Sequence, residues 1–188
     1  MEYYPSRAAV PEEMRTNRLF LRPLRATDVE LDYDAVMSSA EMLRCWSRSS
    51  WPADDFTLSE NLDDLLRHEH EHNESQAFTF TVLNLEGTRC LGCVYLTPLS
   101  PLELQLCEGA AFATNIRLWV RGSEVVNDLD RHLFNTLREW LQAERAFGCQ
   151  EFIVGPEEAR QASLFMEAGL ELRLTFSLPD GRVRSAFQ

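Results

Sequence analysis

The order of strand-like and helix-like segments constrains the fold of this chain more than any single motif. Apolar alternation predicts strands over 18–25, 77–85, 89–97, 111–120, 151–154, 171–178 and 182–187. Caps and apolar residues at helical spacing predict helices over about 27–39, 57–75, 129–148 and 156–169. Such a mixed order predicts one α/β (α+β) domain, with a mostly antiparallel sheet of about 6–7 strands and helices on both faces.

Two capping boxes place the first two helices. Thr27 and Glu30 form one box, and Thr57 and Glu60 form the second. The residues between the two helices, 44–56, predict a loop that exposes two tryptophans. The second helix carries one apolar stripe, formed by Leu58, Leu62, Leu65 and Leu66.

Turn signals divide the remainder of the chain. Gly87 lies between two strand-like runs and predicts a hairpin, and Asp180-Gly181 predicts a second hairpin at the end of the chain. Pro156 and Gly169 bracket the last helix. The terminal hairpin is also where we expect a homodimer to form, if the chain forms one.

Length and composition fit one globular domain. The chain has 188 residues, of which 45% are hydrophobic and 26% charged. We expect residues 1–16 to be an irregular lead-in and 17–188 to form the domain. No composition break or repeat suggests a second domain.

The charge excludes several classes of partner. With 18 cationic and 30 acidic residues, the formal net charge is −12, which argues against nucleic-acid and anionic-membrane binding. Every cationic residue is Arg, so lysine chemistry is excluded. No signal peptide or membrane-spanning run is apparent, and we expect a soluble, cytoplasmic protein.

Neither cysteine nor histidine patterns predict a metal site. Cys90 and Cys93 form the only CxxC of the chain, inside an apolar run in which alternate side chains face opposite ways; we expect both thiols to be buried and reduced. His68 and His72 share one face of a helix at metal-ligand spacing, but Arg and Glu surround them, as on a solvated helix end. We expect no metal.

With TNRLFLRPLRATD at its head, the element order resembles the GNAT superfamily of acyl-CoA-dependent N-acyltransferases, over about residues 16–187. The opening RLFLRPL strand is most similar to the branch of ribosomal-protein N-terminal acetyltransferases. FTFTV at 78–82, CLGCV at 90–94, LWV at 118–120 and the helix that ends at Gly169 also match. The resemblance implies an acetyl-CoA donor and a small-molecule or peptide amine as acceptor.

In that family the donor enters where the fourth and fifth strands separate. The resemblance therefore implies that the end of the fourth strand (Leu118, Trp119, Val120 and Arg121) holds the acyl and pantetheine groups. It also implies that the start of the next helix (Asn127, Leu129 and Arg131) holds the pyrophosphate. Orphan backbone N–H groups and the helix dipole attract anions at such a place.

The pyrophosphate loop departs from the family pattern, [Q/R]-x-x-G-x-[G/A]. Val125 stands where the family has Gln or Arg, and Asp128 and Asp130 stand where it has small residues. Each carboxylate would cost a phosphate about 6 Å away roughly 1–3 kcal/mol. In the alternative interpretation Asp128 or Asn127 caps the helix, and Asp130 complements its dipole, so that the protein fills its own anion site.

The usual proton-transfer residues are absent as well. Asn115 replaces a Glu of the fourth strand, and Phe165 replaces a Tyr of the last helix. Glu108 and Glu151 are weak candidates for the base, from strand position only. Trp46 and Trp51 either line an acceptor cleft or pack as a cap on the core.

Two functional hypotheses follow. In the first, the chain is a GNAT-fold N-acyltransferase that transfers acetyl from acetyl-CoA to an unidentified amine. In the second, it is a non-catalytic binding module that has lost the donor site. Donor binding distinguishes the two.

Overall fold

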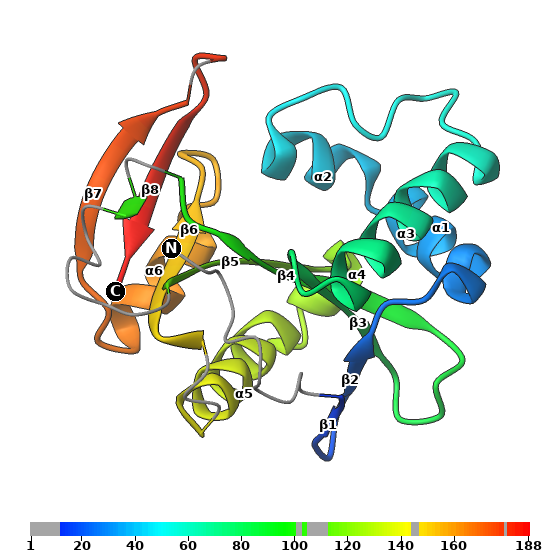
Figure 1. Ribbon diagram of the computed structural model, residues 1–188, viewed down its shortest axis with the longest axis horizontal. Coiled ribbons are helices and arrows are strands. Elements are labelled where there is room, and N and C mark those ends of the chain that lie inside the picture. The colour runs from blue at the N-terminus through cyan, green and yellow to red at the C-terminus, as the bar shows by residue number, and fades with distance from the viewer. Residues whose placement is uncertain (1–11, 101–102, 105–112, 144–146, 179) are drawn as a thin grey trace.

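A computed structural model describes residues 12–100, 103–104, 113–143, 147–178 and 180–188. One sheet of eight strands, in the order β1-β2-β3-β4-β5-β6-β8-β7, runs through the molecule (Figure 1). The strands are β1 (Met14–Arg15), β2 (Phe20–Pro23), β3 (Phe78–Leu83), β4 (Cys90–Pro98), β5 (Ala113–Val120), β6 (Cys149–Val154), β7 (Leu172–Ser177) and β8 (Val183–Phe187). Only β5 and β6 pair in parallel.

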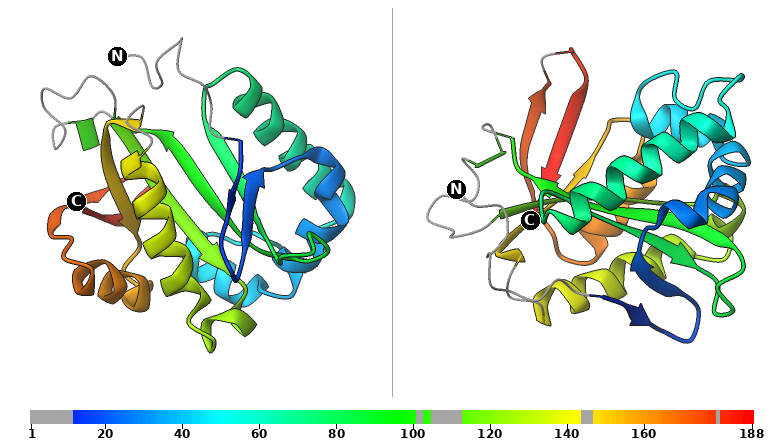
Figure 2. Two further views of the ribbon diagram at one scale, coloured as in Figure 1. Left: turned by 90° about the horizontal axis from the view of Figure 1, so that it is seen from below. Right: turned by 45° about the vertical axis from the view of Figure 1, so that its right-hand side comes forward.

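Helices cover both faces of the sheet, as predicted. They are α1 (Val29–Met37), α2 (Ala40–Ser47), α3 (Leu58–Asn73), α4 (Gly122–Val125), α5 (Leu129–Ala143) and α6 (Ala159–Glu167). Figure 2 shows α3 on one side of the sheet and α5 on the other. The mixed, mostly antiparallel α/β sheet is confirmed, with one strand more than expected because Met14–Arg15, in the expected irregular lead-in, pairs with β2.

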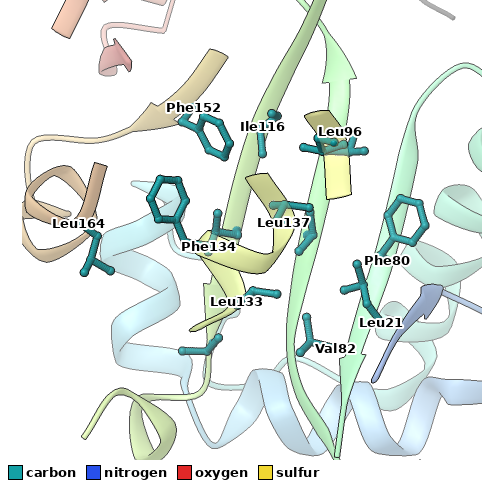
Figure 3. Packing of buried hydrophobic residues seen from close by; sticks show 14 of the residues in the cluster. Leu21, Phe80, Val82, Leu96, Ile116, Leu133, Phe134, Leu137, Phe152 and Leu164 are labelled. Carbon is teal, nitrogen blue, oxygen red and sulfur yellow. The ribbon is translucent and has the colours of Figure 1, made fainter. Parts of the chain in front are cut away.

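Alternation along the strands explains the two cores. Ile116, Leu118 and Val120 of β5 face α5 and α6, together with Phe80 of β3 (Figure 3). Trp119, between them in sequence, faces α1 and α3. Burying one apolar set on each face fixes the register, because a slip of one residue would exchange the two sets.

A β-bulge in β4 changes the expected placement of the CxxC cysteines. The register with β3 shifts between Val82 and Leu83, so that Cys90 and Cys93 lie in the same core instead of on opposite faces. Gly92 is required there because a Cβ would lie 2.1 Å from the Trp119 carbonyl oxygen. Both thiols are free and buried, as expected.

The helix starts confirm one capping box and correct the other. Thr57 and Glu60 exchange the two expected hydrogen bonds at the start of α3. The first helix instead begins with a 3₁₀ turn, Ala26–Asp28, in which the Asp28 carboxylate accepts the Arg25 amide. Thr27 lies inside that turn and is not the N-cap residue, and the Asp28 carboxylate also binds Arg22 at 2.7 Å.

Three further expectations were wrong in detail. The expected loop 44–56 begins inside α2, and the last helix begins at Ala159, with Pro156 in the turn before it. Of the predicted α3 stripe, Leu65 is buried, whereas Leu58 and Leu66 are exposed. The hairpin at Gly87, the turn at Gly181 and Gly169 after α6 all have the expected positive φ. Within the part of the chain described, no helix is long and apolar enough to cross a membrane.

Candidate functional site

The candidate site lies where β5 and β6 separate. Their parallel pairing covers Ala113–Ile116 and Cys149–Phe152 and then stops, while both strands continue in their antiparallel pairings with β4 and β8. The Leu118 carbonyl oxygen beyond the divergence accepts Trp46 Nε1 at 3.1 Å and Gln161 Nε2 at 2.8 Å. Because a strand residue points its N–H and C=O to the same side, the amide of Leu118 faces the same opening.

A pocket of about 240 Å³ fills this opening. It is bounded by α2, the end of β5, the loop before α5 and the start of α6. Its lining combines an apolar wall with charged residues at the α6 side: Met42, Cys45, Trp46, Trp119, Val120, Val125, Asp130, Glu157, Glu158, Arg160 and Gln161. This pocket is therefore lined by three of the residues suggested as site residues from the sequence, Trp46, Trp119 and Val120. The backbone of Leu118 lies at its edge.

The loop between α4 and α5 keeps a glycine-like backbone. Asp128 has a φ of 52°, in the left-handed region that favours glycine. The family pattern has its glycine at this position. The side chain is an aspartate, but the backbone conformation is the one a glycine would adopt.

The two loop aspartates are bound by one arginine of α6. Arg160 Nε lies 2.5 Å from Asp130 Oδ2, and its Nη2 lies 3.0 Å from Asp130 Oδ1 and 2.8 Å from Asp128 Oδ1. Asp130 is buried, and hydrogen bonds to both carboxylates raise the pKa of Arg160. An ion-pair cluster therefore occupies the side-chain space next to the loop where the resemblance implies a pyrophosphate.

The other nominated loop residues are engaged elsewhere. Arg121 is buried and points to the opposite core, where it donates to the Cys90 carbonyl at 2.5 Å and to Asp34 at 2.6 Å. Arg131 pairs with Glu167 of α6 at 2.6 Å. The carbonyl of Asn127 accepts the Arg18 guanidinium at 2.6 Å, and Leu129 packs in the core beneath the sheet.

The two tryptophans have different places. Trp46 lines the pocket, and the Arg117 guanidinium stacks 3.8 Å above its ring. Trp51 packs edge-on against Phe56 in the core between α1 and α3. The sequence left an acceptor cleft and a cap on the core open for both residues. Trp51 packs as a cap on the core, whereas Trp46 lines the pocket where β5 and β6 separate.

A pair of buried acids lies on the other side of the divergence. Glu151 of β6 is in register with Asn115 of β5 and faces the same way. Asn115 Nδ2 donates to Glu103 Oε1 at 2.8 Å, and the Ser100 amide donates to Glu103 Oε2 at 2.6 Å. Burial, with the charge of Glu103 added, raises the pKa of Glu151 to about 7. The other candidate base, Glu108, lies outside the described residues.

Sequence reasoning missed four residues at this site: Glu103, Glu158, Arg160 and Gln161. Glu158 Oε1 accepts the Gly155 amide at 2.6 Å and Arg117 Nη2 at 3.1 Å, which places a partly buried ion pair inside the divergence. Nothing in their spacing links these residues to the fourth strand, because they reach it only through the tertiary fold. Phe165, expected at the position of a catalytic Tyr, is buried against Phe134 and Phe152.

The histidines are not arranged as metal ligands. His68 Nδ1 is within 3.1 Å of Thr79 Oγ1, and the ring of His72 packs on Phe78 and Phe80. The helix end is therefore part of the core edge rather than solvated as expected. Among the described residues, one group has metal-ligand proximity, with Asp32, Cys90 and Cys93 within 4.8 Å of one another. Burial raises the pKa of Asp32 to about 6.

Comparison with solved structures identifies the fold. The ribosomal-protein-S5-alanine acetyltransferase from Vibrio fischeri superposes with a TM-score of 0.72 at 13% identity, covering 94% of this chain and 95% of that chain. RimL, a ribosomal L7/L12 α-N-protein acetyltransferase, gives 0.72 at 12%, covering 98% and 97%. The microcin C7 self-immunity acetyltransferase MccE, solved with acetyl-CoA and AMP, gives 0.71 at 10%, covering 92% of each chain.

At these identities the likeness shows the fold: the chain has the fold of GNAT acetyltransferases, and its structural neighbours include the ribosomal-protein branch that its first strand resembles. No family model matches the sequence. No curated protein matches it either.

Proposed function

We propose that the chain is an N-acyltransferase that transfers an acetyl group from acetyl-CoA to a primary amine. The observation that carries the proposal is the pocket at the divergence of β5 and β6, with a buried acid of raised pKa on the other side of the same divergence. The proposed donor site and the proposed base then lie on opposite sides of the place where β5 and β6 separate.

The thioester arm of the donor would occupy the pocket between Trp46 and the end of β5. There the backbone amides of Leu118 and Val120 point into the opening and polarise the thioester carbonyl. Before the arm can bond to β5, the side chains of Trp46 and Gln161 must leave the Leu118 carbonyl, which they now share.

The pyrophosphate would lie against the loop that begins α5. The backbone of Asp128 already has the conformation that the glycine of this loop would adopt, so the N–H groups can face an anion. Arg160, whose side chain is 47% exposed, offsets the two carboxylates and is close enough to contact the phosphates as well. We expect donor binding to be weaker than with a glycine loop, because two negative charges are offset by one positive charge.

In the chemical step, the amine nitrogen attacks the thioester carbonyl carbon. The new C–N bond forms, the C–S bond breaks, and CoA leaves as its thiolate. The amine proton passes to Glu151, directly or through Glu103 or water, and water protonates the thiolate. A carboxyl group with a pKa near 7 suits this role because it is partly ionised at neutral pH and still basic.

The testing experiment is a donor titration followed by a transfer assay. Purified protein is titrated with acetyl-CoA, and release of the CoA thiol is then followed with a panel of primary amines. Saturable donor binding and amine-dependent thiol release support the proposal. The competing hypothesis, a binding module without a donor site, predicts neither. The homodimer through the terminal hairpin and the absence of a metal stay predictions.

A further inference from the structure

A second cavity, of about 330 Å³, lies on the face of the sheet that carries Asn115 and Arg117. It is bounded by the segment after β4, the strands β5 and β6, and the β7–β8 hairpin. The lining residues are Pro98, Leu99, Ser100, Glu103, Asn115, Arg117, Ile153, Phe176, Leu178, Arg182 and Arg184. Five apolar side chains line this cavity together with one acidic residue, Glu103, and three arginines.

The basic end holds a buried arginine, Arg184, that lies near Glu158 without forming a direct ion pair with a described residue. Arg184 is 3% exposed, yet no carboxylate of the described residues lies within 4.0 Å of it, unlike Arg182 or Arg117, which pair with Asp180 and Glu158. Its hydrogen bonds go to the carbonyls of Val183 and Ser47, both at 3.4 Å. A buried guanidinium normally has a close anionic partner, so this one has donors left for an anion in the cavity.

The acidic end holds a carboxylate whose hydrogen bonds from described residues come from neutral donors. Glu103 is 3% exposed and accepts from the Ser100 amide and from Asn115. Glu151 adds a second acid behind it, and burial together with the charge of Glu103 raises the pKa of Glu151. An ammonium group at this end would be attracted by the carboxylate of Glu103.

The strand register gives the spacing of the two ends. Glu151 is in register with Asn115, whereas Ser185 pairs with Val154, so that Arg184 reaches the level of Gly155. At about 3.3 Å per residue the backbone positions are roughly 13 Å apart, and the long Glu and Arg side chains shorten the gap between their charged groups. The cavity can therefore hold a molecule with opposite charges several bonds apart.

We propose that this cavity is the acceptor site, and that the acceptor is a small primary amine that also carries a carboxylate, joined by a short apolar chain. The carboxylate binds Arg184, the apolar chain lies against Ile153 and Phe176, and the amine points to Glu103 and Glu151. This inference rests on the proposed function for the reaction itself, but not for the binding of the ligand.

The test measures binding without a donor, by calorimetry on the full chain at low salt. The probes are 6-aminohexanoate, 4-aminobutyrate and L-leucine, which differ in charge separation, with hexylamine and hexanoate as single-charge controls. We expect at least one amino acid to bind tenfold more tightly than hexylamine and hexanoate. If hexylamine binds as tightly as all three amino acids, or if none binds, the proposal is overturned.

Variants of the charged residues test which residue binds each charged group of the ligand. Arg184→Gln and Glu103→Gln should each weaken binding of the best probe at least tenfold, whereas Arg173→Gln, an exposed arginine on the same hairpin, should not change it. Arg184 is buried, so the folding of its variant is checked by thermal unfolding; the ligand series and Glu103→Gln remain decisive if that variant does not fold. Unchanged binding in Glu103→Gln contradicts the proposal.

The outcomes separate this inference from the proposed function. Thiol release with neutral amines, without a preference for amines that carry a carboxylate, would support the proposed transferase activity and contradict the proposed acceptor site. Binding of an amino acid without any acetyl transfer from acetyl-CoA would support the proposed binding site and contradict the proposed transferase activity.

Discussion

Arg160 and Asp130 form a two-point ion pair that ties the start of α6 to the first turn of α5. Nε lies 2.5 Å from Oδ2 and Nη2 lies 3.0 Å from Oδ1. The Asp130 side chain is 5% exposed, whereas that of Arg160 is 47% exposed. The pair therefore neutralises a buried carboxylate beside the loop where we propose that the pyrophosphate of the donor binds.

Removing the arginine should destabilise the protein. Arg160→Gln leaves Asp130 buried without its cation, which should lower the free energy of unfolding by about 1–2 kcal/mol, less than a fully buried pair because the arginine is half exposed. Urea unfolding measures the loss. Adding Asp130→Asn to Arg160→Gln should recover part of it, since the unpaired charge is then gone. Additive losses in the double variant would show that the two residues are not coupled.

Glu151 should control the pH dependence of transfer. Its pKa is raised to about 7, so the rate should rise with pH up to about 7 and then level, in line with the ionised fraction. Glu151→Gln should abolish the rise of the transfer rate with pH below about 7 and should lower the rate at pH 8 by about 10²–10⁴-fold. A variant with the wild-type profile would assign the base elsewhere.

The same residue should lower stability as the pH rises. Its folded pKa lies above the usual value of 4.5, so the folded state retains the proton and the penalty of ionising it appears between about pH 4.5 and 7. Glu151→Gln should therefore be more stable than wild type at pH 8, by about 1–3 kcal/mol, with little of this difference at pH 4.5. Equal pH slopes for the two proteins between these values would contradict the raised pKa.

Cysteine alkylation should report occupancy of the pocket. Cys45 is exposed and lines the pocket, whereas Cys90 and Cys93 are 1% exposed. Under native conditions iodoacetamide should label Cys45 and leave Cys90 and Cys93 unmodified, as peptide mass spectrometry can show. Saturating acetyl-CoA should slow labelling of Cys45 severalfold. Unchanged labelling at saturating donor would place the donor outside the pocket.

The fold could be predicted because its signals are local. The capping box at Thr57 and the Asp180-Gly181 turn each depend on residues close in sequence, and both are where the sequence predicts them. The capping box predicted for Thr27 and Glu30 does not form. Asp28 is a second acidic residue near the start of this helix, and it is the one that pairs with Arg22 of β2.

The candidate site could be predicted only in part. The pocket where β5 and β6 separate lies where the family resemblance implies a donor site, and Trp46, although it was expected in a loop, lines this pocket from α2. Arg160 could not be assigned to the loop aspartates, because the contact joins residues 30 and 32 positions apart across two helices. Arg121 was expected at the end of the fourth strand beside the donor, yet the alternation that turns Trp119 to the opposite core turns Arg121 there as well.

The most direct test of the central claim, that a donor binds at the divergence of β5 and β6, is a titration of acetyl-CoA into wild type and Asp128→Gly. Glycine suits the φ of 52° and removes one carboxylate from the loop, so donor affinity should rise about 5- to 100-fold. Asp63→Asn, which removes an exposed charge on α3, is the matched control and should leave the affinity unchanged. Tighter binding by Asp128→Gly alone is the predicted result. No binding by either wild type or Asp128→Gly at millimolar acetyl-CoA would contradict the account.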